Sequence, residues 1–235
     1  MKIMAINPNT TASMTEKIGA VARSVASPGT EIIACNPQSG PAAIEGHYDE
    51  ALSAIGVLEE ICKGEAEGMD GYVIACFGDP GLLAARELAK GPVLGIAEAA
   101  MHAASFISTG FSVVTTLGRT RTIAQHLVDN YGMTRFCRNV RAIDLPVLSL
   151  ETPQAKAAIW QECRLALEQD HCGAIVLGCA GMADLPMQLS QELGIPVIDG
   201  VSAAVKFVEA LVCLGIGTSK VGDLAYPTSK SYLSA

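Results

Sequence analysis

The sequence predicts an α/β fold of two pseudo-symmetric lobes, each a parallel four-stranded sheet flanked by helices, which face each other across a cleft. Three observations lead to this fold class. Half of the 235 residues are hydrophobic but only 5% are aromatic, which is typical of a core packed from Ala, Val, Leu and Ile. Short apolar runs alternate with helical patterns, and the second half of the chain repeats the first.

Eight short runs rich in Val and Ile predict the strands. They are residues 2–6, 30–35, 72–75 and 93–95 in the first half, and 111–115, 140–143, 174–177 and 197–198 in the second. Because helical patterns separate them, each set of four is expected to pair in parallel.

Apolar residues at spacings of three and four predict helices between these strands. The clearest helical patterns cover residues 11–26, 49–68, 119–131 and 153–170. Thr152 followed by Pro153 is a good helix start, since Thr can cap the free amides and proline at the first position loses no hydrogen bond. Residues 99–118 lack charged side chains, but six of them are Ser or Thr, and residues 108–110 indicate a turn rather than a membrane span.

The two halves match each other at corresponding strands. Residues 72–79 (YVIACFGD) align with 174–181 (AIVLGCAG), with the two cysteines one position out of step. Residues 91–94 (GPVL) match 194–197 (GIPV), and an Ala-rich helix follows each. Such repeats usually pack about a pseudo-twofold axis, and ligands bind open parallel sheets at the carboxyl ends of the strands. Cys76 and Cys179 both lie at such an end, so we expect them on opposite walls of one cleft.

Two facing thiols suit the inversion of a carbon centre. A carbon between a carbonyl and a nitrogen can lose its proton to give a planar, enolate-like intermediate, and two groups on opposite faces can remove and return the proton. A reference pKa of about 8.5 allows one cysteine to be thiolate and the other thiol. Helix amides and dipoles beyond the two glycine-bearing turns are expected to lower the thiol pKa and to hold the enolate oxygen.

Other reactive residues have simpler interpretations. The remaining cysteines (35, 62, 137, 163, 172 and 213) are expected to be small packing residues, and no Cys-x-x-Cys pair occurs. The cluster His171, Cys172 and Cys179 is a weak candidate for zinc, so we expect no metal. His47 could border the cleft but suits a helix start better, and Asp79 could cap its own turn.

Charge excludes two classes of partner. The chain has 16 Lys and Arg against 24 Asp and Glu, a net charge of −8. Without a basic cluster, neither nucleic acid nor a membrane surface is an expected partner. The polar residues that follow Ile6 do not fit a secretory signal, which predicts a cytoplasmic protein. Residues 215–220 lack the spacing of a phosphate-binding loop, and the two-thiol chemistry requires no cofactor.

At these residues the chain resembles the aspartate/glutamate/hydantoin racemase superfamily, and within it the hydantoin and allantoin racemase branch. The resemblance covers nearly the whole chain. It rests on residues 6–11 (INPNTT), 40–49 (GPAAIEGHYD), 75–81 (ACFGDPG), 113–117 (VVTTL) and 177–182 (LGCAGM).

The resemblance implies a cofactor-independent enzyme that assembles into a homo-oligomer, with Cys76 and Cys179 as its catalytic pair. It also implies ligand contacts from Asn9, Ile44, Gly78, Thr115, Thr116 and Gly181. In such a fold residues 1–97 form the first lobe, completed by the C-terminal segment 207–235, and residues 98–206 form the second lobe.

The residues after the cysteines favour a neutral ring over an amino acid as substrate. In the superfamily's amino-acid racemases polar residues follow the cysteines, whereas here Phe77-Gly78 and Ala180-Gly181 do. A zwitterion needs charged partners, and these turns offer mainly amides and hydroxyls. The expected reaction is therefore inversion at C5 of a 5-substituted hydantoin, with allantoin a leading candidate. An amino-acid racemase, a cysteine-dependent isomerase or decarboxylase, and more remotely a non-catalytic small-molecule sensor remain alternatives.

Overall fold

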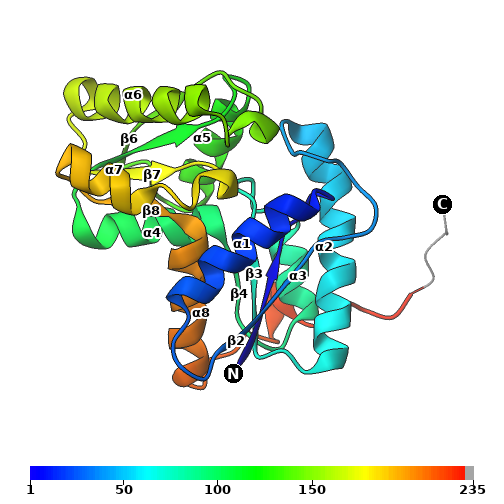
Figure 1. The fold of residues 1–235 in the computed structure, drawn as a ribbon. Coiled ribbons are helices and arrows are strands. Elements are labelled where there is room, and N and C mark those ends of the chain that lie inside the picture. The colour runs from blue at the N-terminus through cyan, green and yellow to red at the C-terminus, as the bar shows by residue number, and fades with distance from the viewer. Residues whose placement is uncertain (231–235) are drawn as a thin grey trace.

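The computed structural model describes residues 1–230 and contains two parallel four-stranded sheets (Figure 1). The strand orders are β2-β1-β3-β4 and β6-β5-β7-β8, so the second half of the chain repeats the topology of the first. The strands are β1 (Lys2–Ile6), β2 (Glu31–Cys35), β3 (Gly71–Ile74), β4 (Val93–Gly95), β5 (Phe111–Thr115), β6 (Cys137–Ala142), β7 (Ala174–Leu177) and β8 (Val197–Asp199). The predicted fold class is confirmed.

Helices connect successive strands and cover the sheets. They are α1 (Ala12–Val25), α2 (His47–Glu67), α3 (Leu82–Leu88), α4 (Ile96–Ile107), α5 (Thr120–Asn130), α6 (Pro153–Asp170), α7 (Pro186–Leu193) and α8 (Gly200–Cys213), with short 3₁₀ turns η1 (Val147–Ser149), η2 (Ala180–Met182) and η3 (Gly222–Leu224). None of the helices within residues 1–230 is long and apolar enough to cross a membrane.

The element boundaries follow local chemistry. Thr152 caps α6 by accepting a hydrogen bond from the Ala155 amide at 3.2 Å, and Pro153 opens the helix as predicted. Strand β6 begins at Cys137 instead of residue 140, because Cys137 already pairs with Phe111 ahead of an irregularity in register. The short helices α3 and α7 were not predicted, since neither is long enough to show a clear apolar period.

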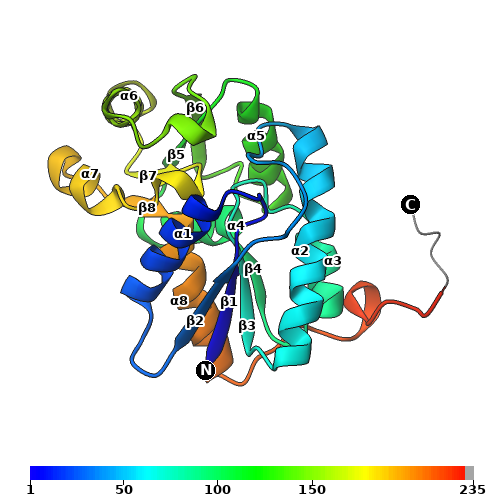
Figure 2. The ribbon, with the colours of Figure 1, turned by 45° about the vertical axis from the view of Figure 1, so that its right-hand side comes forward.

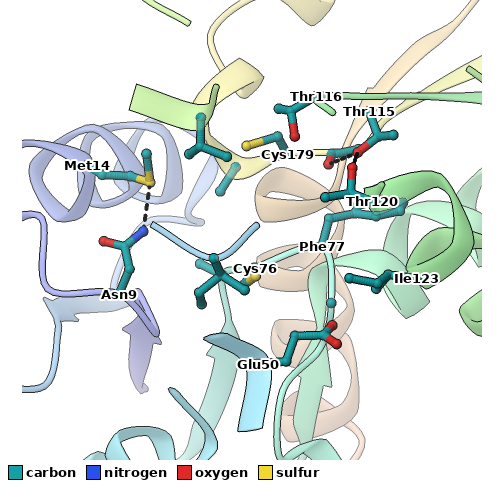
Figure 3. A pocket seen from close by; sticks show the side chains of 16 residues that line it. Asn9, Met14, Glu50, Cys76, Phe77, Thr115, Thr116, Thr120, Ile123 and Cys179 are labelled. Atoms are coloured by element: carbon teal, nitrogen blue, oxygen red, sulfur yellow. Dashed lines mark hydrogen bonds between the residues drawn. The ribbon is translucent and has the colours of Figure 1, made fainter. Parts of the chain in front are cut away.

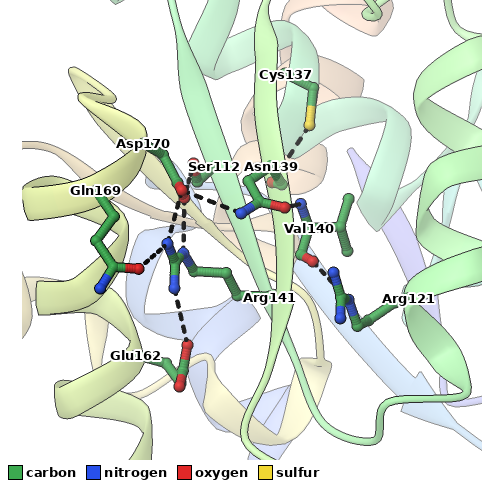
Figure 4. Close-up of polar contacts among 9 residues, drawn as sticks. All are labelled: Ser112, Arg121, Cys137, Asn139, Val140, Arg141, Glu162, Gln169 and Asp170. Carbon is green, nitrogen blue, oxygen red and sulfur yellow. Dashed lines mark hydrogen bonds and ion pairs between the residues drawn. The ribbon is translucent and has the colours of Figure 1, made fainter.

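A buried carboxylate fixes α6 to the second sheet, away from the cysteine turns (Figure 4). Asp170 accepts hydrogen bonds from Ser112 Oγ at 2.9 Å and Asn139 Nδ2 at 3.0 Å, and Arg141 binds both of its oxygens at 2.7 Å. Burial acts to raise the pKa of Asp170, but these donors outweigh it and hold the pKa below its ordinary value. Cys137 Sγ contacts the Asn139 carbonyl within the same cluster, which accords with a structural cysteine.

The two halves exchange their last helices. Helix α4 follows β4 of the first sheet but packs against β7 and β8 of the second, whereas α8 follows β8 and packs against β3, β4 and α1. The two helices also pack against each other, and Figure 2 shows α8 running beside the first sheet. One hydrophobic core therefore contains buried residues of both sheets and of both helices.

The predicted lobe boundaries at residues 97 and 206 stay predictions. Helix α8 itself spans the second boundary, since it runs from Gly200 to Cys213. The last part of the predicted C-terminal segment 207–235, residues 231–235, lies outside the described residues.

The starts of α4 and α8 meet at Gly200. A Cβ atom on Gly200 would lie 2.2 Å from the backbone oxygen of Ile96 and 2.6 Å from the Ile96 Cβ. Ile96 is the first residue of α4 and Gly200 the first residue of α8. Because a backbone atom blocks the space, only glycine permits this approach of the two helices.

Gly200→Ala should therefore destabilise the protein. We expect the free energy of unfolding to fall by about 1–3 kcal/mol, because the added methyl must push α4 and α8 apart. Urea denaturation monitored by circular dichroism measures the change. Ala210→Ser, which adds one atom at an exposed position of the same helix, is the control. An unchanged midpoint for Gly200→Ala would show that the helices do not depend on this contact.

Candidate active site

A pocket opens at the carboxyl ends of the two sheets, and residues from both halves of the chain line it (Figure 3). The lining residues are Asn9, Met14, Ile44, Glu50, Ala75, Cys76, Phe77, Gly78, Thr115, Thr116, Thr120, Ile123, Val147, Gly178, Cys179 and Ala180. Figure 3 shows Asn9 and Met14 at one end of the pocket and Thr120, Ile123 and Glu50 at the other, with Cys76 and Cys179 between them.

Cys76 and Cys179 occupy equivalent positions in the two sheets. Strand β3 ends at Ile74 and β7 at Leu177, so each cysteine is the second residue after its strand. In the sequence comparison the two cysteines are one position out of step. They are in step in the structure, because β3 begins at Gly71 and β7 at Ala174, and each cysteine is the sixth residue counted from its strand start. Both strands hold the third place in their sheets, so the repeat supplies one thiol from each half to the same pocket.

Five of the six other residues that the sequence singled out line this pocket: Asn9, Ile44, Gly78, Thr115 and Thr116. The sixth, Gly181, lines a neighbouring pocket together with Lys17. The Gly181 amide nevertheless lies 3.4 Å from Cys179 Sγ and donates a hydrogen bond to it. Gly181 is therefore not among the residues that line this pocket, although its amide contacts the Cys179 thiol.

Five lining residues lie outside every motif that the sequence singled out: Met14, Glu50, Thr120, Ile123 and Val147. Four of them lie in the first turn or so of a helix that follows a loop already singled out. Side chains just after such a loop project toward the same edge of the sheet, and this placement could have identified them. Val147 lies in η1, which no pattern in the sequence predicts.

One hydrogen-bond donor in the pocket, Nδ2 of Asn9, has only a weak acceptor. Asn9 Oδ1 accepts hydrogen bonds from Asn7 Nδ2 and from the Thr11 amide, both at 2.9 Å. Asn9 Nδ2 points instead at Met14 Sδ, at 3.2 Å, and a thioether is a weak acceptor. The side-chain amide of Asn9 is therefore suited to donate to a carbonyl group of a ligand.

Thr115 is already engaged within the protein. Its hydroxyl lies 3.0 Å from Thr120 Oγ1 and 3.3 Å from the carbonyl oxygen of Gly178 (Figure 3). These contacts join β5, α5 and the residue that precedes Cys179, so Thr115 shapes the pocket wall around that cysteine.

Burial dominates the protonation of both thiols. It raises the pKa of Cys179 to about 11 and raises the pKa of Cys76 further, while the backbone amides of Gly181 and Gly78 act in the opposite direction. The amides that act belong to the two turns and not to the long helices beyond them, and the predicted net lowering of the pKa is wrong because the loss of hydration outweighs these amides.

The two thiols differ in their charged neighbours. Lys17 Nζ on α1 lies 2.6 Å from the Gly181 carbonyl oxygen and 2.7 Å from Asp184 Oδ1, and it also forms an ion pair with Glu151. The Lys17 charge lowers the pKa of Cys179, whereas the Glu45 charge raises it. Near Cys76 the charged groups are acidic, and they raise its pKa. Of the two thiols, Cys179 therefore has the cation that favours its thiolate.

Asp79 joins the Cys76 turn to both halves of the molecule. Its carboxylate accepts hydrogen bonds from the Ala97 amide at 3.0 Å, the Glu98 amide at 2.9 Å and the Tyr131 hydroxyl at 2.7 Å. Asp79 therefore caps α4, whereas the sequence suggested a cap at its own turn. Burial raises the pKa of Asp79 to about 7, although these three donors oppose the shift.

Among residues 1–230 no group of three or more His, Cys, Asp or Glu side chains is arranged to hold a metal ion. His47 and His126 stack on each other with their ring centroids 6.1 Å apart, and neither lines the pocket. The acid–base groups that the pocket itself offers are the two thiols and the Glu50 carboxyl.

A family model, curated proteins and solved structures each match nearly the whole chain. The family model for Asp/Glu/Hydantoin racemase matches residues 3–208. The chain is 52% identical to the hydantoin racemase of Pseudomonas sp. (strain NS671), covering 100% of this chain and 95% of that protein. It is 54% identical to the hydantoin racemase of Rhizobium meliloti, covering 98% and 97%. Among solved structures, the allantoin racemase from Klebsiella pneumoniae has a TM-score of 0.98 and 60% identity, covering 100% and 96%.

The raised thiol pKa can be tested by alkylation of a Cys76→Ser variant with iodoacetamide. Because only the thiolate reacts, the alkylation rate of Cys179 should rise about tenfold per pH unit from about pH 7 to about pH 10. Peptide mass spectrometry separates Cys179 from the other cysteines. Adding Lys17→Met should slow the reaction further at each pH.

The urea-unfolded variant is the control for this titration. There the rate for Cys179 should level off near the ordinary thiol pKa of about 8.5. A plateau at that same pH in the folded variant would mean that burial does not control the thiol.

Proposed function

Since the chain belongs to the Asp/Glu/Hydantoin racemase family, we propose that it inverts the C5 centre of a hydantoin ring without a cofactor, using Cys76 and Cys179 as the two acid–base groups. The enzyme is an isomerase of the hydantoin racemase type. One observation carries the mechanistic proposal. Two thiols at equivalent positions of a repeated fold line the same pocket, one from each half.

The proposed reaction moves one proton at each face of the ring. The thiolate of one cysteine takes the proton from C5, and the electron pair of the C–H bond passes into the adjacent carbonyl to give an enolate. The thiol of the other cysteine then donates its proton to C5 from the opposite face, and the pair of electrons returns to carbon. The product has the inverted configuration, and the thiolate now lies on the second cysteine.

Catalysis needs one thiol to lose its proton before the reaction begins. Each pH unit between the solution and the thiol pKa costs about 1.4 kcal/mol. Because the pKa of Cys179 is nearer to neutrality than that of Cys76, we propose that the resting thiolate resides mainly on Cys179. The amides of Gly181 and Gly78 support the sulfur charge on each side.

The pocket favours a neutral ring over an amino acid. No Lys or Arg is among its lining residues in the described chain, so a substrate carboxylate would find no cation there. The nearby ammonium of Lys17 already binds the Gly181 carbonyl and two carboxylates. The same argument disfavours an amino-acid racemase and a decarboxylase, both of which must bind a carboxylate.

Allantoin is the leading candidate among hydantoins, because Asn9 and Thr116 can bind a polar ureido substituent at C5. Ile44 and Phe77 from the same lining could serve an alkyl or aromatic substituent instead. We further propose assembly into a homo-oligomer, which the sequence resemblance implies, and a cytoplasmic location.

Cys76→Ser and Cys179→Ser should each lower racemisation by about 10³-fold or more, because a serine hydroxyl cannot replace the thiolate as base. The loss of optical rotation of enantiopure allantoin, 5-isopropylhydantoin and 5-benzylhydantoin measures the rate. Cys62→Ser, at an exposed cysteine on α2, is the matched control. Full activity in either pocket variant would exclude the two-cysteine mechanism.

Solvent exchange should separate the two faces of the substrate. In deuterated water each single variant retains one cysteine, so it should exchange the C5 proton of one enantiomer and spare that of the other. Proton nuclear magnetic resonance of the separate enantiomers follows the C5 signal. Equal exchange of both enantiomers by both variants would contradict two separate acid–base groups.

A further inference from the structure

Apart from the two thiols, Glu50 is the only residue with an ionisable side chain of Asp, Glu, Lys, Arg or His type that lines the described pocket. It lies in the first turn of α2, and only 18% of its side chain is exposed. Figure 3 places its carboxylate at the end of the pocket with Ile123 and Phe77, on the same wall as Cys76. The proposed two-thiol reaction gives this carboxylate no part in proton transfer.

The two oxygens of Glu50 have different surroundings. Oε2 lies 3.1 Å from His47 Nδ1, and the His47 ring is stacked on His126 of α5. Oε1 lies against Gly78, because a Cβ atom at residue 78 would be only 2.3 Å from it. Glycine at position 78 is therefore what allows the carboxylate to approach the Cys76 turn.

Within residues 1–230 no side chain or backbone amide donates a hydrogen bond to Oε1. A carboxylate accepts several hydrogen bonds when ionised. None of the buried side-chain oxygens in the described residues lacks a hydrogen-bond partner, so Oε1 of Glu50 is an oxygen that remains open to the pocket. Burial raises the pKa of Glu50, while the neighbouring histidines oppose the shift. A donor supplied by a bound molecule would complete the set of partners at this oxygen.

The opposite end of the pocket has the complementary polarity. There the Asn9 side-chain amide is a donor whose partner is only a thioether sulfur. A hydantoin carries carbonyl acceptors beside N–H donors in one small ring, so it can use both ends at once. An amino acid would bring an ammonium group to Glu50, but its carboxylate would lie in the same pocket without a cation.

We propose that Glu50 is a substrate-binding residue that accepts a hydrogen bond from an N–H of the ureide, in the hydantoin ring or its ureido substituent. This inference rests on the proposed function. It assigns specificity for neutral ureides with a free N–H to one side chain. Because this contact exists before and during proton transfer, its loss should raise KM more than it lowers kcat.

The test compares Glu50→Ala with substrates that lack single N–H groups. If the contact is to a ring nitrogen, Glu50→Ala should lower kcat/KM with 5-isopropylhydantoin by about 10- to 100-fold, the usual effect of removing a charged hydrogen-bond partner. Of the N1-methyl and N3-methyl derivatives, one lacks the contacting N–H, and with that derivative Glu50→Ala should leave kcat/KM unchanged. With the other derivative the loss in kcat/KM should persist. If the contact is to the ureido group, the loss should appear with allantoin and be absent with 5-isopropylhydantoin.

Two variants keep the result interpretable. Glu50→Gln retains the shape and one acceptor, so it should fall between Glu50→Ala and the unaltered enzyme even if Glu50→Ala folds poorly. Glu59→Gln, an exposed carboxylate on the same helix, should change nothing. Alkylation of Cys179 should also be unaffected, which separates substrate binding from a distorted pocket.

The outcomes are distinct. A loss that depends on one N–H group supports the assignment and identifies the group. An equal loss with the parent hydantoins and all N-methyl derivatives, or none with any substrate, overturns it. If the unaltered enzyme racemises no hydantoin at all, the proposed function fails instead.

Discussion

The contact between the starts of α4 and α8 is the constraint on which the rest of the structure depends. The two helices meet where Gly200 touches the Ile96 backbone, and each packs against the sheet of the opposite half. This arrangement places the two sheets about a shared core, with the carboxyl ends of β3 and β7 bordering one pocket. Equivalent positions after two equivalent strands thereby supply two thiols to one space.

The backbone repeat does not extend to the charges. Lys17 reaches from α1 to the turn that carries Cys179, whereas Asp79 and Glu50 lie near Cys76. Even the helix caps differ, because Asp79 from the cysteine turn caps α4 while Asp199 directly precedes and caps α8. A symmetric scaffold therefore holds two thiols in unequal electrostatic surroundings, with a cation near one and carboxylates near the other.

Much of the fold could be predicted because its signals are local or repeated. The alternation of strands and helices, the Thr152 cap and the equivalence of Cys76 and Cys179 are all present in the order of the residues. The rest depends on contacts between distant segments. The proximity of Glu50 to Gly78 requires α2 to pack beside the Cys76 turn, and the raised thiol pKa reflects burial by both halves. Neither can be deduced from spacing along the chain.

The exchange of α4 and α8 also has a consequence for how the chain reaches its native state. Each sheet takes part of its helical cover from the other half, since α8 packs on β3 and β4 and α4 packs on β7 and β8. A partly translated chain that ends before residue 200 would leave apolar strand surface in water. Folding and unfolding of the halves are therefore expected to be coupled into a single cooperative transition, with no stable half-molecule along the way.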